Sequence, residues 1–189
     1  MFRRNIFMIP TDILAEYYDR RSKAFSILVE HGKQVAEKAL LAAEQVSHLK
    51  PDLDFIFKAA MLHDIGILET NSPGFGCRGK QPYICHGILG CKMLEKIGVP
   101  EYGLICERHV GVGISAEDVS QFNLPLPPRD MLPVTIEEQI ICYADKFFSK
   151  NGNGNKSKQK PVEKILDGLK RYGPDKVARF QSWVELFEK

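Results

Sequence analysis

Six polar residues in this sequence fall where a helical pattern would be expected to carry hydrophobic ones. His31, for example, lies three residues after Leu28 and four before Val35, inside the apolar face of a predicted helix. The other five also lie within apolar helical stretches or at their ends: His63, Asp64, His86, His109 and Asp145. The pattern therefore predicts imidazoles and carboxylates that point toward the interior of the protein.

An inward-facing carboxylate needs a cation or a dense set of hydrogen-bond donors, because a buried aspartate without a partner costs several kcal/mol or takes up a proton. A single buried histidine is more often a hydrogen-bonded core residue than a ligand. Here, however, five separate segments each deliver such a residue, and several neutral imidazoles with two carboxylates are best balanced by metal ions. His48 follows Glu44 and Gln45 near a helix end and is expected to face solvent, outside the predicted metal site.

Other chemistries find less support. The sequence contains no serine in a nucleophile elbow, no Walker loop and no HExxH motif. Cys85 beside His86 suggests a thiol nucleophile, but adjacent helical side chains point in different directions. The odd set of cysteines has no CxxC pair, which argues against disulfides or a zinc ribbon and favours buried or partly buried thiols in a reducing compartment. They are Cys77, Cys85, Cys91, Cys106 and Cys142.

Hydrophobic periodicity predicts helices along almost the whole chain, with no repeat and no convincing strand, so the expected fold class is all-α. Thr135 and Glu138 have the spacing of a capping box. The predicted helices cover about Ser22–Leu49, Asp52–Gly66, Tyr83–Ile97, Pro100–His109, Thr135–Phe148, Val162–Leu169 and Asp175–Phe187.

The length of 189 residues suits one compact domain. Residues 1–149 are predicted to carry the metal site, residues 150–160 to be a flexible linker, and residues 161–189 to form helices that pack on the same domain. A formal net charge of +2 gives no strong signal for nucleic acid or a membrane surface. No apolar stretch is long enough for a bilayer, and the run after Arg3-Arg4 is too short for a secretory signal, so a cytoplasmic location is expected.

The order of the six polar residues resembles the HD superfamily of metal-dependent phosphohydrolases. The matching residues are His31, His63-Asp64-Ile65-Gly66 (the HDIG form of the family signature), His86, His109 and Asp145. The resemblance implies an HD-domain helical bundle. It also implies a first metal ion held by His31, His63, Asp64 and Asp145, and a second held by Asp64, His86 and His109. In size and ligand order the chain is similar to the small bacterial dinucleoside polyphosphate hydrolases of this superfamily.

The resemblance implies hydrolysis of a phosphoester or phosphoanhydride, in a nucleotide or a related small phosphorylated substrate, by hydroxide that bridges two divalent metal ions. Iron, manganese, cobalt or nickel best suit the mixed nitrogen and oxygen ligands, and zinc or magnesium stay open. Because di-iron oxygenases of the superfamily use the same ligands, an HD-type di-iron oxygenase is the alternative. A non-catalytic nucleotide-sensing module is another, although an intact ligand set argues against it.

The sequence departs from many HDIG proteins after the glycine, where Ile67 replaces a lysine. If that lysine binds phosphate in relatives, other cations must do so here, and each candidate is equally well explained as a surface charge. The candidates are Arg78, Lys80, Arg108 and Lys146. Of these, Arg78 and Lys146 are predicted to serve catalysis together with Asp64.

Two long loops are expected to frame the substrate pocket, the loop from Asn71 to Pro82 and the segment from Gly111 to Pro133. Aromatic residues in or near them are candidates to stack on a base, although an aromatic in a helical protein is more often part of the core. They are Phe75, Tyr83 and Phe122.

Overall fold

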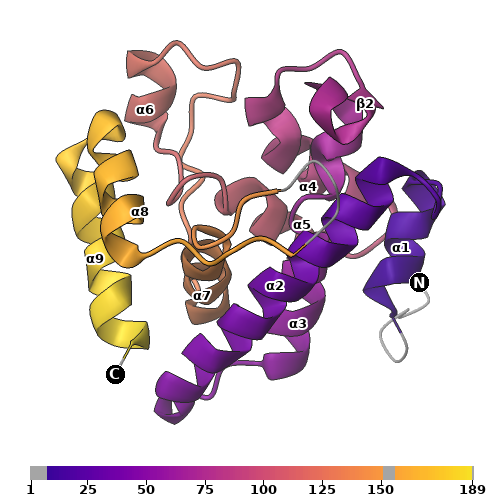
Figure 1. Ribbon diagram of the computed structural model, residues 1–189. Helices are drawn as coiled ribbons and strands as arrows, with labels where there is room; N and C mark the ends of the chain where they lie inside the picture. Colours follow the sequence, from indigo (N-terminus) through magenta and orange to yellow (C-terminus); the bar gives the residue numbers. More distant parts are fainter. Residues whose placement is uncertain (1–7, 151–155, 189) are drawn as a thin grey trace.

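Residues 8–150 and 156–188 are described by the computed structural model, and they form a bundle of helices (Figure 1), so the predicted all-α class is confirmed. The α-helices are α1 (Pro10–Tyr17), α2 (Lys23–Gln45), α3 (Leu53–Leu62), α4 (His86–Lys96), α5 (Pro100–Arg108), α6 (Ala116–Gln121), α7 (Ile136–Asp145), α8 (Val162–Leu169) and α9 (Pro174–Phe187). Short 3-10 helices are η1 (Ser47–Leu49), η2 (Ile65–Glu69), η3 (Pro73–Phe75), η4 (Tyr83–Cys85) and η5 (Lys170–Tyr172). In the described ranges the only strands, β1 (Asn71–Ser72) and β2 (Cys77–Arg78), pair as a small antiparallel hairpin.

Side-chain caps fix where several helices begin. The Ser22 hydroxyl accepts a hydrogen bond from the backbone N–H of Phe25 (3.1 Å) at the start of α2. Asp52 caps α3 in the same way, and the predicted capping box of Thr135 and Glu138 is present at α7. These caps satisfy N–H groups that have no partner within the helix, and they thereby fix where each helix begins. All three helices begin within one residue of the predicted positions.

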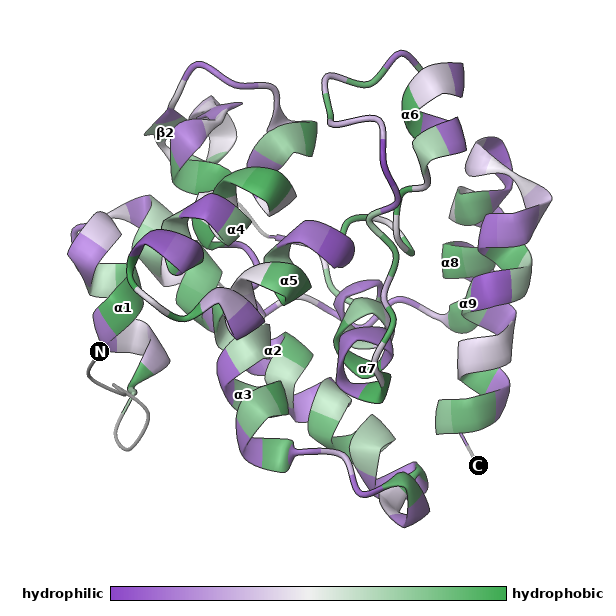
Figure 2. Cartoon of the chain, turned by 180° about the vertical axis from the view of Figure 1, so that it is seen from behind, coloured by the Kyte–Doolittle hydropathy of each residue, from purple (hydrophilic) through white to green (hydrophobic). Residues whose placement is uncertain are grey.

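The long helix α2 packs against α3 and α7 (Figure 1). A small residue lets α2 and α3 approach closely, because a Cβ atom on Gly32 would lie only 3.1 Å from the Cα of Met61. The neighbouring rings of His31 and His63 have centroids 5.2 Å apart. The helices carry both polar and hydrophobic residues (Figure 2), and many of the hydrophobic ones pack into a buried core.

The predicted helix over residues 52–66 is wrong at its end, because α3 stops at Leu62 and the chain turns into η2. Tyr18, at the end of α1, holds this turn. Its hydroxyl donates a hydrogen bond to the Ile65 carbonyl oxygen (2.7 Å) and accepts one from the Leu68 N–H (2.6 Å). Tyr18 is distant in sequence, so helical periodicity alone could not reveal the turn.

Two glycines bring α4 against its neighbours. A Cβ atom on Gly66 would collide with the His86 carbonyl oxygen and with the backbone of Gly90 in α4. A Cβ atom on Gly87 would lie 2.6 Å from the carbonyl oxygen of Cys106 in α5. Because these obstacles are backbone atoms, a larger side chain would force the elements apart. The glycines therefore set the spacing between the HDIG turn, α4 and α5.

Other boundaries differ by short stretches. α2 ends at Gln45 and gives way to η1, the chain before His86 is a 3-10 turn, and α7 ends at Asp145. Neither α1 nor α6 was predicted. α6 begins at a capping box formed by Ser115 and Asp118, but it is too short for periodicity to reveal.

The C-terminal helices α8 and α9 follow, and α9 packs on α7. The ring of Tyr143 in α7 stacks on Phe180 in α9, with centroids 5.5 Å apart.

Before α8, residues 156–160 run back along the bundle (Figure 1), and the Gln34 side chain forms hydrogen bonds with the backbone of Ser157. Residues 151–155, the centre of the predicted linker, lie outside the described residues.

The cysteines and His48 lie where the sequence predicted. All five cysteines are buried and free, and His48 is exposed. Within the part of the chain that the structure describes, no helix combines the length and hydrophobicity needed to cross a membrane.

Candidate metal centre

The six predicted polar side chains meet in one buried cluster. None is more than 6% exposed, and subsets of their donor atoms lie within 4.8 Å of one another. They are His31 in α2, His63 and Asp64 in the turn after α3, His86 at the start of α4, His109 just after α5 and Asp145 at the end of α7. Five segments that are distant in sequence thus converge on one point.

Three of the histidine rings are oriented by the same kind of contact with the backbone. In each, Nδ1 lies within hydrogen-bond distance of the backbone carbonyl oxygen three residues earlier. The pairs are His63 with Ala60 (2.6 Å), His86 with Tyr83 (2.7 Å) and His109 with Cys106 (2.7 Å). A carbonyl oxygen only accepts, so Nδ1 carries a proton in each ring and Nε2 turns toward the cluster. This is the usual second contact of a metal-binding histidine.

The first ligand group comprises His31, His63, Asp145 and the Oδ2 atom of Asp64. His31 Nε2 lies 2.9 Å from Asp145 Oδ1 and 3.4 Å from Asp64 Oδ2. His63 Nε2 lies 3.1 Å from Asp64 Oδ2 and 3.5 Å from Asp145 Oδ1. Two imidazole nitrogens and two carboxylate oxygens therefore face one another.

The second ligand group comprises His86, His109 and the other oxygen of Asp64. Asp64 Oδ1 lies 3.3 Å from His86 Nε2 and 3.5 Å from His109 Nε2. The two Nε2 atoms lie 3.1 Å apart. Asp64 thus directs one carboxylate oxygen into each ligand group.

These spacings are compatible with metal coordination. Two ligand atoms about 2.1 Å from one ion lie about 3.0–3.4 Å apart in octahedral or tetrahedral geometry, close to the contacts found here. Several of the buried atoms also have no hydrogen bond of good geometry among the described residues, although Lys150 forms an ion pair with Asp64 Oδ2. They are both oxygens of Asp64, Nε2 of His63 and Nδ1 of His31. Of these, the Asp64 oxygens and His63 Nε2 face the other ligand atoms, where they fit a divalent metal ion.

The two aspartates stay ionised in the interior. Burial alone would raise the pKa of Asp64, but the charges of His63 and Lys150 outweigh it and hold the pKa well below its usual range. Lys146 and Lys150 outweigh burial in the same way at Asp145. The cluster therefore contains two buried negative charges that need cations.

The surroundings shift the pKa values of the histidines in different directions. Burial, assisted by Lys150, lowers the pKa of His31 to about 4, and burial lowers the pKa of His109 to about 4. Both rings are thus neutral near pH 7 and able to bind metal. At His63 burial lowers the pKa, but Asp64 outweighs it and raises the pKa to about 9. A metal ion would displace this proton, as is usual for histidine ligands.

Lys150, the first residue of the predicted linker, reaches into the cluster. Its Nζ lies 2.9 Å from Asp64 Oδ2 and 3.9 Å from Asp145 Oδ1, and its side chain is 12% exposed. Burial lowers the pKa of Lys150, but the two carboxylates outweigh burial and raise it above its ordinary value. In the sequence Lys150 is one of several lysines between residues 146 and 160, so only the fold distinguishes it.

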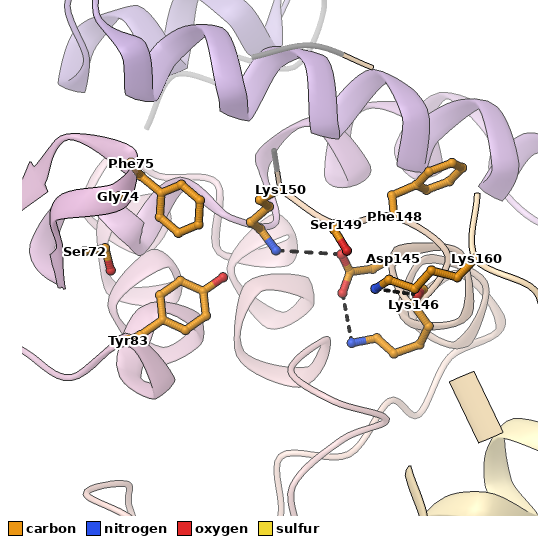
Figure 3. A pocket seen from close by; sticks show the side chains of 10 residues that line it. All are labelled: Ser72, Gly74, Phe75, Tyr83, Asp145, Lys146, Phe148, Ser149, Lys150 and Lys160. Carbon is orange, nitrogen blue, oxygen red and sulfur yellow. Dashed lines mark hydrogen bonds and ion pairs between the residues drawn. The ribbon is translucent and has the colours of Figure 1, made fainter. Parts of the chain in front are cut away.

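An open cavity of about 470 Å³ lies beside the first ligand group and reaches Asp145 (Figure 3). Lys146 and Lys160 lie on one side of it, opposite the rings of Phe75 and Tyr83, whose centroids are 6.0 Å apart. Cationic and aromatic walls suit a ligand that joins an anionic group to a planar ring.

The predicted pocket loops contribute unequally. Residues 71–82 supply part of the lining, but residues 111–133 supply none of it. The expectation for residues 111–133 is wrong for this cavity, because the segment packs a small core of its own around Val119 and Met131. Phe122 points toward Tyr172 instead, with ring centroids 6.4 Å apart.

Of the four predicted phosphate-binding cations, only Lys146 lines the cavity. Its Nζ lies 3.0 Å from Asp145 Oδ2. Arg108 donates a hydrogen bond to Glu138 (2.7 Å), and Arg78 and Lys80 are exposed and absent from the cavity lining. The geometry therefore gives no support to a catalytic role for Arg78.

The sequence profile of the HD domain matches residues 28–149, which include all six clustered side chains. The chain therefore belongs to the HD domain family. Membership suggests a metal-dependent hydrolase, and the histidine and aspartate cluster is the candidate site for divalent metal.

Similar proteins give further context. An uncharacterised protein of Methanocaldococcus jannaschii is 36% identical over 137 residues, which cover 67% of this chain and 73% of that protein. Two proteins named tRNA (cytidine(56)-2′-O)-methyltransferase also match, from Thermoplasma volcanium (28% identical, 82% of this chain) and Picrophilus torridus (30% identical, 69% of this chain). The matches span only 40% and 34% of those two longer proteins. No solved structure is significantly similar to the chain.

Proposed function

We propose that the protein is a phosphohydrolase that uses two divalent transition-metal ions to cleave a phosphoester or phosphoanhydride bond in a nucleotide or a related small substrate. One observation carries the proposal. The Asp64 carboxylate directs one oxygen into each ligand group, and the first group adjoins a cavity lined by lysines. A shared carboxylate between two ligand groups is well suited to a two-metal hydrolase.

Each ligand group would hold one ion. The first ion would be held by His31, His63, Asp64 and Asp145, and the second by Asp64, His86 and His109. When bound, such ions supply Lewis acidity, which lowers the pKa of water and stabilises negative charge on a phosphoryl group. Iron, manganese, cobalt and nickel suit the mixed nitrogen and oxygen ligands best, and zinc and magnesium belong in the same test.

The cavity residues would bind and orient the substrate. Lys146 and Lys160 present ammonium groups on one wall, where they would bind phosphoryl oxygens and stabilise the charge that develops during bond cleavage. Phe75 and Tyr83 present rings on the other side, where a nucleobase would stack. This division of the cavity supports a nucleotide as substrate.

Elemental analysis and a hydrolysis screen with Mn(II), Fe(II), Co(II), Ni(II), Zn(II) or Mg(II) test the proposal. We expect phosphate release from nucleotides by the metal-loaded protein. The substitution Asp64→Ala should abolish bound metal and turnover together, because Asp64 serves both ligand groups. His48→Ala changes an exposed histidine outside the cluster, so this matched control should retain both properties. Wild-type turnover by the Asp64→Ala protein would contradict the proposal.

The same screen distinguishes two alternatives. An HD-type di-iron oxygenase would consume oxygen in its iron form when given substrate and would release no phosphate. A nucleotide-sensing module would bind nucleotide tightly in metal-replete protein without turnover. Because two relatives are named tRNA methyltransferases, the screen should include tRNA beside small nucleotides.

A further inference from the structure

The Lys150 ammonium lies against the carboxylate oxygens of the first ligand group. Its Nζ is 2.9 Å from Asp64 Oδ2 and 3.9 Å from Asp145 Oδ1. These are the two oxygens that also face His31 and His63. Lys150 therefore contacts the atoms that the first metal ion would use.

The surrounding charges explain why an ammonium group is stable at this position. Asp64 and Asp145 are both buried, and two ionised carboxylates in a protein interior require compensating cations. Lys146 contacts the other oxygen of Asp145, at 3.0 Å. Among the lysines and arginines of the described residues, Lys150 alone has an ion pair with Asp64.

An ammonium group and a metal ion cannot both keep these oxygens. They carry like charge, and repulsion between them at a few ångströms in a buried site is strong. Lys150 also lines the open cavity beside Tyr83 and Lys146 (Figure 3), so its flexible side chain has space to leave the cluster without disturbing the helices.

We propose that Lys150 is an internal counter-ion of the metal centre, which neutralises Asp64 and Asp145 before metal binds and competes with the first metal ion for their oxygens. The inference rests on the metal site of the proposed function. In the metal-loaded protein the displaced ammonium stays in the cavity, beside the lysines that face an anionic substrate.

The substitution Lys150→Met tests the proposal, because methionine keeps much of the length of the side chain and removes its charge. In metal-stripped protein we expect the Tm to fall by about 5 °C or more, because two buried carboxylates lose a partner. The affinity for Mn(II) or Co(II), measured by calorimetric titration, should rise about tenfold or more, because the competing cation is gone. The metal-loaded variant should regain the Tm of the metal-loaded wild type.

Lys158→Met is the matched control, because it removes the same charge from an exposed lysine eight residues further along the chain. We expect it to leave Tm and metal affinity unchanged. Unchanged or weaker metal affinity in Lys150→Met, or an equal loss of Tm with and without metal, would overturn the role of Lys150 while leaving the metal site intact. Failure of the wild-type protein to bind metal would instead overturn the proposed function and this inference with it.

Discussion

The Nε2 atoms of His86 and His109 lie 3.1 Å apart, although His86 begins α4 and His109 follows the end of α5. Each ring has its Nδ1 at a backbone carbonyl oxygen, so both rings direct Nε2 to the same point. Two lone pairs at this distance repel each other unless a cation or a proton lies between them. The pair is therefore the clearest mark of the second ligand group.

Removing His109 should empty one ligand group and leave the other. We expect His109→Ala to lose about one of two bound ions per chain, because the first group keeps all its ligands. Elemental analysis of the dialysed protein measures this directly. His48→Ala should keep the full metal content, and full metal content in His109→Ala would contradict a separate second site.

Gly66 should tolerate no side chain. Gly66→Ala places a methyl group against the backbone of His86 and Gly90, and we expect a loss of about 2 kcal/mol or more in the free energy of unfolding. Gly168→Ala is the control, because this exposed glycine lies in α8 with no atom within 4 Å of the added Cβ. That change should stabilise the protein by about 0.5–1 kcal/mol. Urea unfolding compares the two, and equal effects would refute the close approach of η2 to α4.

The metal-free protein should become less stable in acid. The pKa values of His31 and His109 are lowered by burial from 6.5 to about 4, so the unfolded chain takes up protons there before the folded chain does. The free energy of unfolding therefore falls as the pH drops from 6.5 toward 4. Urea unfolding in the presence of a chelator measures the slope. His109→Leu should flatten it, His48→Leu should not, and identical slopes in all three proteins would exclude this cause.

Gln34 should hold the segment before α8 in place. Its buried side chain donates a hydrogen bond to the Ser157 carbonyl oxygen (2.8 Å) and accepts one from the Ser157 N–H (2.9 Å). We expect Gln34→Leu to increase the rate of tryptic cleavage after Lys156 or Lys158 by about tenfold, because local opening no longer breaks these bonds. Gln159→Leu changes an exposed residue of the same segment and should cleave as the wild type does. Equal rates in the two variants would show that Gln34 does not restrain the segment.

Much of the site could be predicted because its residues break a regular pattern. A histidine or aspartate on an apolar helical face, such as His31 or Asp145, is conspicuous in sequence, and the structure buries each of them. Helix starts were predictable for a similar reason, since caps such as Thr135 act through neighbours only three residues away.

The missed features depend on contacts between distant residues. The hydroxyl of Tyr18 stabilises the turn into η2 by bonding Ile65, which lies 47 residues later in the sequence. Lys150 likewise contacts the carboxylate of Asp64, which belongs to a distant segment. Arg78 is an equally suitable candidate in the sequence, yet it is exposed and outside the cavity lining. Local sequence gives the chemical type of a side chain, but the packing of elements decides which lysine or arginine meets the substrate.

In the metal centre, the direction of the rings of His63, His86 and His109 and the distances between these rings have different structural causes. Each ring takes its direction from a carbonyl oxygen within its own turn, whereas the distances between rings depend on how the helices pack. A substitution that slightly expands the core should thus leave the nitrogens correctly aimed but further apart. Core packing would then select the radius of the preferred ion without any change of ligand.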